Sequence, residues 1–188
     1  DHCLTGMEFA AGIPGSVGGA LVMNAGAYGS EIKNILKSAR VMTNEGEVLE
    51  LSVDELELGY RTSCIPGRGY TVLEASFQLE PGDGAAIEAR MKELAARRRE
   101  KQPLEYPSAG STFKRPQGYF AGKLIEDAGL RGYGMGGARV SEKHCGFVIN
   151  GGNATASDVM ALCGHIRKTV LEQSGVELEM EVKRWGEF

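Results

Sequence analysis

The sequence of 188 residues has no closely spaced cysteine pair, no long hydrophobic run and no excess of basic residues. Cys3, Cys64, Cys145 and Cys163 lie far apart, which is typical of reduced thiols and argues against a disulfide framework or a metal site. A formal charge of −4 gives no global attraction to nucleic acid or anionic lipid. The first residues, DHCLTGMEFA, have neither the basic start nor the apolar core that a signal peptide has, and they do not begin with methionine. We therefore expect a cytoplasmic protein without metal, nucleic-acid or membrane partners.

Glycine, in contrast, is abundant. The chain has 27 glycines, which is about twice the usual share. They follow no period of three and stand among 42% hydrophobic residues, so a collagen-like or disordered low-complexity chain is excluded. The length suits one large domain or two small ones.

Hydrophobic periodicity predicts separate blocks of strands and helices, which favours an α+β fold over a doubly wound sheet. The expected strands include a hairpin over 35–53 that turns at Asn44-Glu45-Gly46, and strands at 72–80, 145–150 and 176–185. A helix is expected after Asp83 and ends in the basic run 97–101. We attribute that run to the helix dipole rather than to nucleic-acid binding. A domain boundary is expected near Gln102.

The carboxyl-terminal half contains the clearest helix signal. Thr155 and Asp158 form a capping-box-like start, and Gly175 ends the helix. A shorter helix containing Leu124 and Ile125 precedes it, followed by Gly129. Both helices have an apolar face that a single core can bury.

Two glycine motifs resemble phosphate-binding templates but lack their context. The GxGxxG match at 132–137 follows a helix and leads into a predicted strand, the reverse of a Rossmann site. Residues 12–19 lack the lysine of a P-loop, and Pro14 stands where a nucleophile elbow needs glycine. Residues 12–29 form either an open main chain that approaches a flat or phosphorylated ligand, or a tight turn between strands.

Five segments in order resemble the UDP-N-acetylenolpyruvoylglucosamine reductase family. They are GIPGSVGGALVMNAGAYGSEI, LGYRTS, KQPLEYPSAGSTFKRPQGYFAGKLIEDAGLRG, GGARVSEKHCGFVIN and LEMEVKRWG. The resemblance spans the chain and fits the family's shorter type, because no long insertion follows GYRTS. It implies the second lobe of a vanillyl-alcohol-oxidase-type FAD-binding domain followed by an α+β substrate-binding domain. The implied ranges are 1–101 for the flavin part, 102–178 for the substrate domain and 179–188 for a strand that returns to the flavin domain.

The resemblance also implies an activity in peptidoglycan precursor synthesis. FAD, reduced by NADPH, would reduce the enolpyruvyl ether of UDP-N-acetylglucosamine enolpyruvate to UDP-N-acetylmuramate. The catalytic positions are matched by Arg61, Ser111 and Glu181. Arginine would stabilise an enolate-like carboxylate, the serine would donate a proton, and the glutamate would orient or polarise the site.

Further residues follow from the same resemblance. The flavin-lining residues are Ile13, Pro14, Gly15, Ser16, Gly18, Gly19, Asn24, Gly26 and Ala27. The substrate-binding residues are Lys101, Lys114, Arg115, Lys123 and His144, although His144 is also explained as an ordinary histidine at a strand edge. Gly134 stands where many relatives have a larger residue.

Two other functions are compatible with the sequence. The chain could be another oxidoreductase of the same flavin fold, or a UDP-sugar-binding module without catalytic competence. Relatives have an amino-terminal region that supplies the first flavin lobe, and nothing here corresponds to it. We therefore expect the missing lobe to belong to the same polypeptide, and this piece to bind FAD weakly or not at all.

Overall fold

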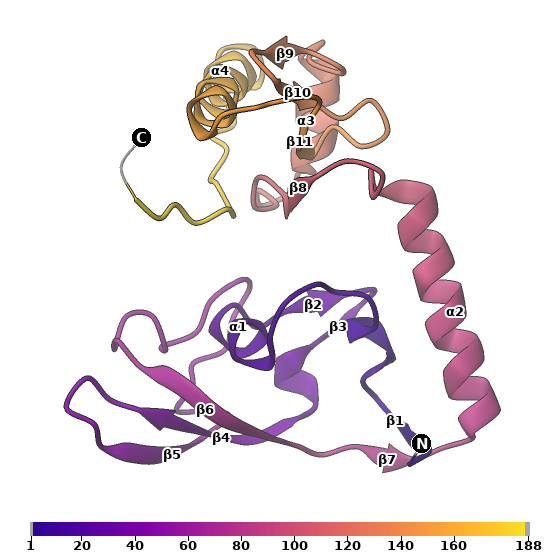
Figure 1. The fold of residues 1–188 in the computed structure, drawn as a ribbon, viewed down its shortest axis with the longest axis vertical. Coiled ribbons are helices and arrows are strands. Elements are labelled where there is room, and N and C mark those ends of the chain that lie inside the picture. Colours follow the sequence, from indigo (N-terminus) through magenta and orange to yellow (C-terminus); the bar gives the residue numbers. More distant parts are fainter. Residues whose placement is uncertain (1, 187–188) are drawn as a thin grey trace. The chain divides into compact units, whose positions relative to one another are not determined.

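The computed structural model describes residues 2–186, and the chain folds as two compact units that divide between Arg97 and Arg98. The expected domain ranges include residues 1, 187 and 188, which lie outside the described part. Each unit combines antiparallel sheets with separate helices, which confirms the α+β prediction (Figure 1). In the described residues, no helix is both long and apolar enough to cross a membrane.

The main sheet of the first unit has three antiparallel strands. They are β4 (Leu36–Met42), β5 (Val48–Ser52) and β6 (Thr71–Phe77), in the order β5-β4-β6. The predicted hairpin is confirmed, with Val41 opposite both Leu49 and Val72. Val41 is fully buried, because alternate residues of β4 point into one core.

Shorter elements complete the first unit. They are β1 (Leu4–Thr5), the 3₁₀ turn η1 (Glu8–Ala10), α1 (Val17–Val22), β2 (Gly26–Ala27), β3 (Ser30–Glu31), η2 (Ile32–Asn34) and β7 (Glu80–Pro81). β2 pairs with β3, and β1 with β7. The strand expected over 72–80 is confirmed up to Phe77, but its end is wrong: Glu80 belongs to a separate short strand, β7, because the chain there pairs with β1 rather than with β4.

The helix expected after Asp83 is α2 (Gly84–Lys101). Asp83 Oδ1 accepts hydrogen bonds from the backbone N–H groups of Ala85 at 2.7 Å and Ala86 at 3.3 Å, as a helix cap does. Leu94 is buried, and its carbonyl accepts a hydrogen bond from the hydroxyl of Tyr28 at 3.3 Å. This part of α2 is thus anchored on the segment that contains α1, β2 and β3.

The described residues of the second unit form one four-stranded sheet and two helices, besides the last residues of α2. The strands are β8 (Ser108–Ser111), β9 (Gly134–Met135), β10 (Ala138–Val140) and β11 (Phe147–Asn150), in the order β8-β11-β10-β9, and the helices are α3 (Ala121–Asp127) and α4 (Ala156–Ser174). Strands β9 and β10 form a hairpin across residues 132–137, so the rejection of a Rossmann site there is confirmed. Val140, Ile125 and Ile166 are fully buried in the shared core.

The predicted capping box of α4 is present. Thr155 Oγ1 accepts from the N–H of Asp158 at 3.1 Å, and Asp158 Oδ2 accepts from the N–H of Thr155 at 2.9 Å. Gly175 ends the helix with a φ of 71°.

The strand expected over 176–185 is wrong for the described residues. Met180 and Phe113 form a single antiparallel bridge, flanked by hydrogen bonds from Lys114 N–H to the Glu179 carbonyl at 2.8 Å and from Glu181 N–H to the Thr112 carbonyl at 2.9 Å. The partner segment soon reaches Pro116, which has no N–H to donate, so the pairing stays this short.

Candidate active site

The segment expected to line a flavin presents exposed main chain in the first unit. Helix α1 begins after Ser16, whose Oγ accepts a hydrogen bond from the N–H of Gly19 at 3.1 Å. A Cβ added at Gly15 would meet no atom within 4 Å, so space beside the main chain is open there. Of the expected residues, Pro14, Gly15, Ser16 and Gly19 are exposed, and Ile13, Gly18, Gly26 and Ala27 are half-buried. Main chain with so little side-chain bulk fits a flat, phosphorylated group such as FAD.

Asn24 differs from the other residues of this segment. Its side chain is buried, with 1% exposure. Nδ2 donates to the Gly59 carbonyl at 3.1 Å, and Oδ1 accepts from the N–H of Lys33 at 2.9 Å. Both ends of the amide therefore bind protein backbone rather than project toward a ligand.

Arg61 lies in a tight turn whose ends are Gly59 and Thr62. These two residues exchange backbone hydrogen bonds of 3.1 and 3.4 Å. Arg61 itself has a φ of 54°, in the left-handed region. Its Nη1 and Nη2 atoms each donate to the carbonyl oxygen of Gly26 at 3.3 Å, and its guanidinium lies 5.5 Å from the ring centre of Tyr60. The fold thus brings the expected catalytic arginine onto the expected flavin segment.

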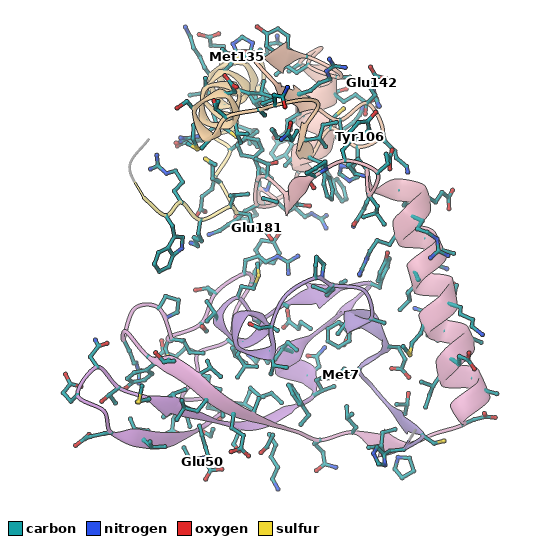
Figure 2. All side chains as sticks on the ribbon, viewed as in Figure 1. Met7, Glu50, Tyr106, Met135, Glu142 and Glu181 are labelled. Carbon is teal, nitrogen blue, oxygen red and sulfur yellow. The ribbon has the colours of Figure 1, made fainter. Side chains whose placement is uncertain are left out.

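The second unit brings Ser111 and Glu181 onto adjacent backbone segments. Ser111 ends β8, opposite Phe147 of β11, and is exposed. The next residue, Thr112, accepts the hydrogen bond from the N–H of Glu181 described above. Figure 2 shows Glu181 on the irregular segment that follows α4, beside β8. The structure therefore joins these two expected catalytic positions through backbone contacts.

Lys114 lies at the same junction. Its Nζ atom is 2.5 Å from Oε1 of Glu179, while its side chain is 22% exposed. The hydrogen bond from Lys114 lowers the pKa of the Glu179 carboxyl, and the lysine charge acts in the same direction. A cation expected to bind substrate is thus paired with an exposed carboxylate that sequence reasoning missed.

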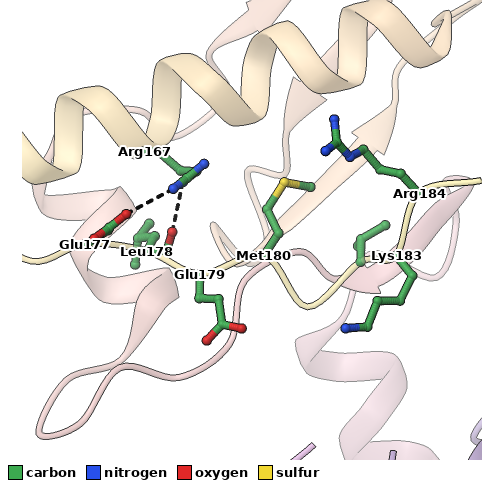
Figure 3. Close-up of a pocket in the computed structure, with 8 residues that line it drawn as sticks. Arg167, Glu177, Leu178, Glu179, Met180, Lys183 and Arg184 are labelled. Carbon is green, nitrogen blue, oxygen red and sulfur yellow. Dashed lines mark hydrogen bonds and ion pairs between the residues drawn. The ribbon is translucent and has the colours of Figure 1, made fainter. Parts of the chain in front are cut away.

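Arg167 of α4 anchors the carboxyl-terminal segment. Its Nε donates to the Leu178 carbonyl at 2.9 Å, and its Nη2 lies 3.1 Å from Oε1 of Glu177 (Figure 3). The hollow beside these contacts is also lined by Met180, Lys183 and Arg184. No sequence pattern marked Arg167, because its partner at Leu178 is a carbonyl oxygen that every residue has.

His144 is held in one orientation within the loop between β10 and β11. Its Nδ1 accepts a hydrogen bond from the N–H of Gly146 at 3.0 Å, and its ring stands edge-on to Phe147 at 5.1 Å. A Cβ at Gly146 would lie 2.9 Å from His144 Cε1, so a larger residue there would displace the ring. Burial lowers the pKa of His144, and the hydrogen bond at Nδ1 places the proton of the neutral ring on Nε2.

The remaining expected substrate residues are exposed on the surface. Lys123 pairs with Asp127 at 2.6 Å, one turn along α3. Arg115 stacks on Phe120, with its guanidinium carbon 3.9 Å from the ring centre. Lys101 is exposed at the end of α2. The described residues contain no group of His, Cys, Asp and Glu that could hold a metal ion.

Comparison with protein families divides the chain into two parts. Residues 1–52 match a family described as an FAD binding domain. Residues 102–185 match the C-terminal domain of UDP-N-acetylenolpyruvoylglucosamine reductase. Together they confirm a flavin-domain segment followed by a reductase C-terminal domain.

Individual proteins give the same result. The chain is 64% identical over 187 residues to UDP-N-acetylenolpyruvoylglucosamine reductase of Lachnoclostridium phytofermentans, covering all of the chain and 60% of that protein. The identity to the reductase of Exiguobacterium sibiricum is 58%, covering all of the chain and 62% of that protein. A crystal structure of the reductase from Thermus caldophilus matches with a TM-score of 0.85 and 35% identity, covering 98% of this chain and 65% of that one.

The chain spans about 60% of the length of the curated relatives that it matches. On these matches, which run over both units, the chain belongs to the UDP-N-acetylenolpyruvoylglucosamine reductase family.

Proposed function

We propose that the whole protein containing this chain reduces the enolpyruvyl ether of UDP-N-acetylglucosamine enolpyruvate, giving UDP-N-acetylmuramate for peptidoglycan synthesis. The observation that carries the proposal is the 64% identity over 187 residues to a reductase of that name. The backbone hydrogen bond from Glu181 to Thr112, the residue that follows Ser111, also supports it. The reaction takes place in the cytoplasm in this proposal, in agreement with the four free cysteines.

The two parts of the chain have different roles in this proposal. In this proposal residues 1–101 belong to the flavin-binding domain and 102–178 form the substrate domain, to which Glu181 is joined through the carbonyl of Thr112. The exposed main chain at Pro14, Gly15, Ser16 and Gly19 would hold FAD, which supplies a hydride when NADPH has reduced it. The relatives are longer than this chain, so the proposed activity is that of the longer polypeptide.

Arg61 would act on the substrate carboxylate. Reduction of the enolpyruvyl double bond adds a hydride to the methylene carbon and a proton to the neighbouring carbon. Negative charge builds on the attached carboxylate after the first addition. A guanidinium held by Gly26 is a preorganised donor for that charge, and such donors stabilise a transition state more than the ground state.

Ser111 would then supply the proton. A positioned general acid contributes about 10²- to 10⁴-fold to a rate. The serine hydroxyl is a weak acid, so exclusion of water and nearby cations are needed to activate it. The Lys114 ammonium follows three positions after Ser111, and Glu181 would orient the serine or polarise its hydroxyl.

The substrate diphosphate would bind to the expected cations and to His144. Lysine and arginine suit anionic oxygens, and the neutral His144 ring has an Nε2–H that can donate. Lys114 is already paired with Glu179, so the substrate would have to compete with that carboxylate.

Turnover by the full-length protein tests the proposal. We expect a stoichiometric flavin spectrum, NADPH oxidation that depends on the enolpyruvyl substrate, and a product two mass units heavier. Absence of flavin together with absence of substrate-dependent oxidation would contradict the proposal. A different electron acceptor with no product from the UDP-sugar would instead favour another oxidoreductase of this fold.

A second candidate concerns the 188-residue chain alone. The second unit has its own hydrophobic core, so the chain could bind the UDP-sugar without catalysing its reduction. The isolated chain would then bind the substrate in a calorimetric titration and show little or no flavin absorbance. A stoichiometric flavin band would rule out this alternative.

A further inference from the structure

The turn that contains Arg61 has a conformation that needs support from outside itself. Arg61 has a φ of 54°, which side chains other than glycine adopt at a cost. The two ends of the turn, Gly59 and Thr62, exchange backbone hydrogen bonds of 3.1 and 3.4 Å. Such a short pairing is weak alone, so neighbouring residues determine where the guanidinium points.

Asn24 supplies that support from the interior. Its amide bridges two backbone segments, donating to the Gly59 carbonyl at 3.1 Å and accepting from the Lys33 N–H at 2.9 Å. The side chain is 1% exposed, so neither bond competes with bulk water. Asn24 has a φ of 43°, a conformation that asparagine tolerates better than most residues.

Two further bonds hold the flanks of the same turn. Lys33 Nζ donates to the Leu58 carbonyl at 3.2 Å, just before the turn. Ser63 Oγ donates to the Val22 carbonyl at 2.7 Å, just after it. The acceptors are all backbone carbonyls, so these contacts restrain the main chain of the turn. Asn24 alone of the three side chains reaches Gly59, where the turn begins.

Gly26 completes the arrangement. Its carbonyl accepts a hydrogen bond from each of the two Nη atoms of Arg61, and it lies two residues after Asn24. A Cβ at Gly26 would lie 2.9 Å from the Ser30 carbonyl and 2.9 Å from Glu31 Cβ, so β2 and β3 approach closely only with glycine. The segment from Asn24 to Gly26 thus binds both Gly59, where the turn begins, and the guanidinium of Arg61.

We infer that Asn24 is a positioning residue for Arg61, rather than a ligand of the flavin. The inference rests on the proposed catalytic role of Arg61. An isosteric Asn24→Asp substitution keeps the acceptor for Lys33 but loses the N–H donor to Gly59, and it places carboxylate and carbonyl oxygens together. The turn then loosens, and the guanidinium leaves its productive orientation. Loss of orientation affects the transition state more than substrate binding.

The test compares Asn24→Asp with Asn34→Asp in the full-length protein. Asn34 is a matched control, because its amide is exposed and donates to the Ser30 hydroxyl at 3.4 Å. For Asn24→Asp we expect faster amide hydrogen exchange in residues 58–63, an unchanged flavin content, and a fall in kcat of about 10- to 100-fold with little change in KM. Asn34→Asp should change none of these.

A double variant separates positioning from general stability. If Asn24 acts through Arg61, then Asn24→Asp combined with Arg61→Lys has about the same kcat as Arg61→Lys alone. If the double variant instead lowers kcat by the product of the two single effects, the inference is overturned. Unchanged amide hydrogen exchange of residues 58–63 in Asn24→Asp would also overturn the inference. So would a loss of bound flavin in that variant without faster exchange of these residues. Should Asn24→Asp fail to fold, Asn24→Gly removes the amide while keeping the backbone conformation, with the same expected results.

The kcat of Arg61→Lys alone tests the proposed catalytic role of Arg61 separately from the role of Asn24. A normal kcat in Arg61→Lys alone would remove the catalytic role of Arg61, whatever the exchange data show. A slow Arg61→Lys variant with unchanged exchange in Asn24→Asp would keep the reductase proposal and remove only the role of Asn24.

Discussion

The backbone N–H of Glu181 donates a hydrogen bond of 2.9 Å to the carbonyl oxygen of Thr112. Thr112 directly follows Ser111, so two residues far apart in the sequence lie on paired backbone segments. Thr112 is itself buried, and its Oγ1 accepts from the N–H of Val148 at 2.9 Å. The junction is therefore built on the sheet of the second unit, and the proposed roles of its residues can be tested one at a time.

Ser111→Ala should separate the two halves of the proposed reaction. We expect NADPH to reduce the flavin of the full-length protein at the normal rate, whereas reduction of the UDP-sugar falls by about 10²- to 10⁴-fold, because the general acid is lost. Stopped-flow absorbance measures both steps. Ser108→Ala is the control, since Ser108 is exposed on the same strand. Unimpaired substrate reduction in Ser111→Ala would exclude the proton-donor role.

Glu179→Gln should strengthen substrate binding. Glu179 lies 2.5 Å from Lys114 and so competes with the substrate diphosphate for that ammonium. Removing a surface ion pair changes an affinity only modestly, so we expect the KM for the UDP-sugar to fall by up to about 5-fold. Lys114→Met should raise it. Glu177→Gln, which affects the pair with Arg167 instead, is the control. A KM that rises in Glu179→Gln would contradict a substrate-binding Lys114.

His144 should titrate below its ordinary range. Burial lowers the pKa of His144 in the folded protein, so the unfolded chain binds more protons near and below about pH 6.5. The neutral ring thus contributes stability that is present at higher pH and is lost as the pH falls through the unfolded pKa toward the folded one. NMR titration of the imidazole should give a midpoint below 6.5. A midpoint at or above that value would show that the ring is not held as described.

Thr155→Ala should loosen the start of α4. The substitution removes the acceptor for the N–H of Asp158, and loss of such a cap costs about 1 kcal/mol. Hydrogen exchange in the first turn of α4 should accelerate about 5-fold, while that of its last turn stays nearly unchanged. Ser157→Ala, an exposed position in the same turn, should not accelerate it. Equal exchange in the two variants would mean that the capping box is not formed.

The four cysteines of the chain should react with a thiol reagent at very different rates. Cys3 is exposed, whereas the other three are buried. Burial raises the pKa of Cys64 and Cys145, and raises that of Cys163 to about 11, so little thiolate forms at neutral pH. Mass spectrometry of the native chain should find one rapidly modified position, Cys3. The rapid phase should vanish in Cys3→Ser and persist in Cys163→Ser, and persistence in Cys3→Ser would contradict the burial pattern.

Local signals in the sequence were sufficient for several elements. The hairpin of β4 and β5, the cap at Asp83 and the capping box of α4 each depend on residues within a few positions of one another. Propensity, period and capping are properties of such short windows, so the pattern alone predicts them. The α+β class was predicted from the same signals, because they place strands and helices in separate parts of the sequence.

Other features depended on partners that no local pattern identifies. The division of the strand at 72–80 results from the pairing of β7 with β1, at the opposite end of the first unit's sequence. The segment 176–185 alternates like a strand, yet it has only the bridge from Met180 to Phe113. An alternating pattern shows which side chains are buried. It does not show over how many residues a neighbouring strand is available for pairing.

By itself, the sequence determined the fold class, the family and the identity of the candidate site residues, because these depend on residue types and their order. Tertiary structure alone decided that Asn24 faces the interior, that Arg61 is held by the carbonyl of Gly26, and that Lys114 is paired with Glu179. The reason is physical. Two of these three contacts end on backbone carbonyls, which every residue has, and the third joins charges that are distant in the chain. Only the folded backbone selects which of the many equivalent partners each side chain meets.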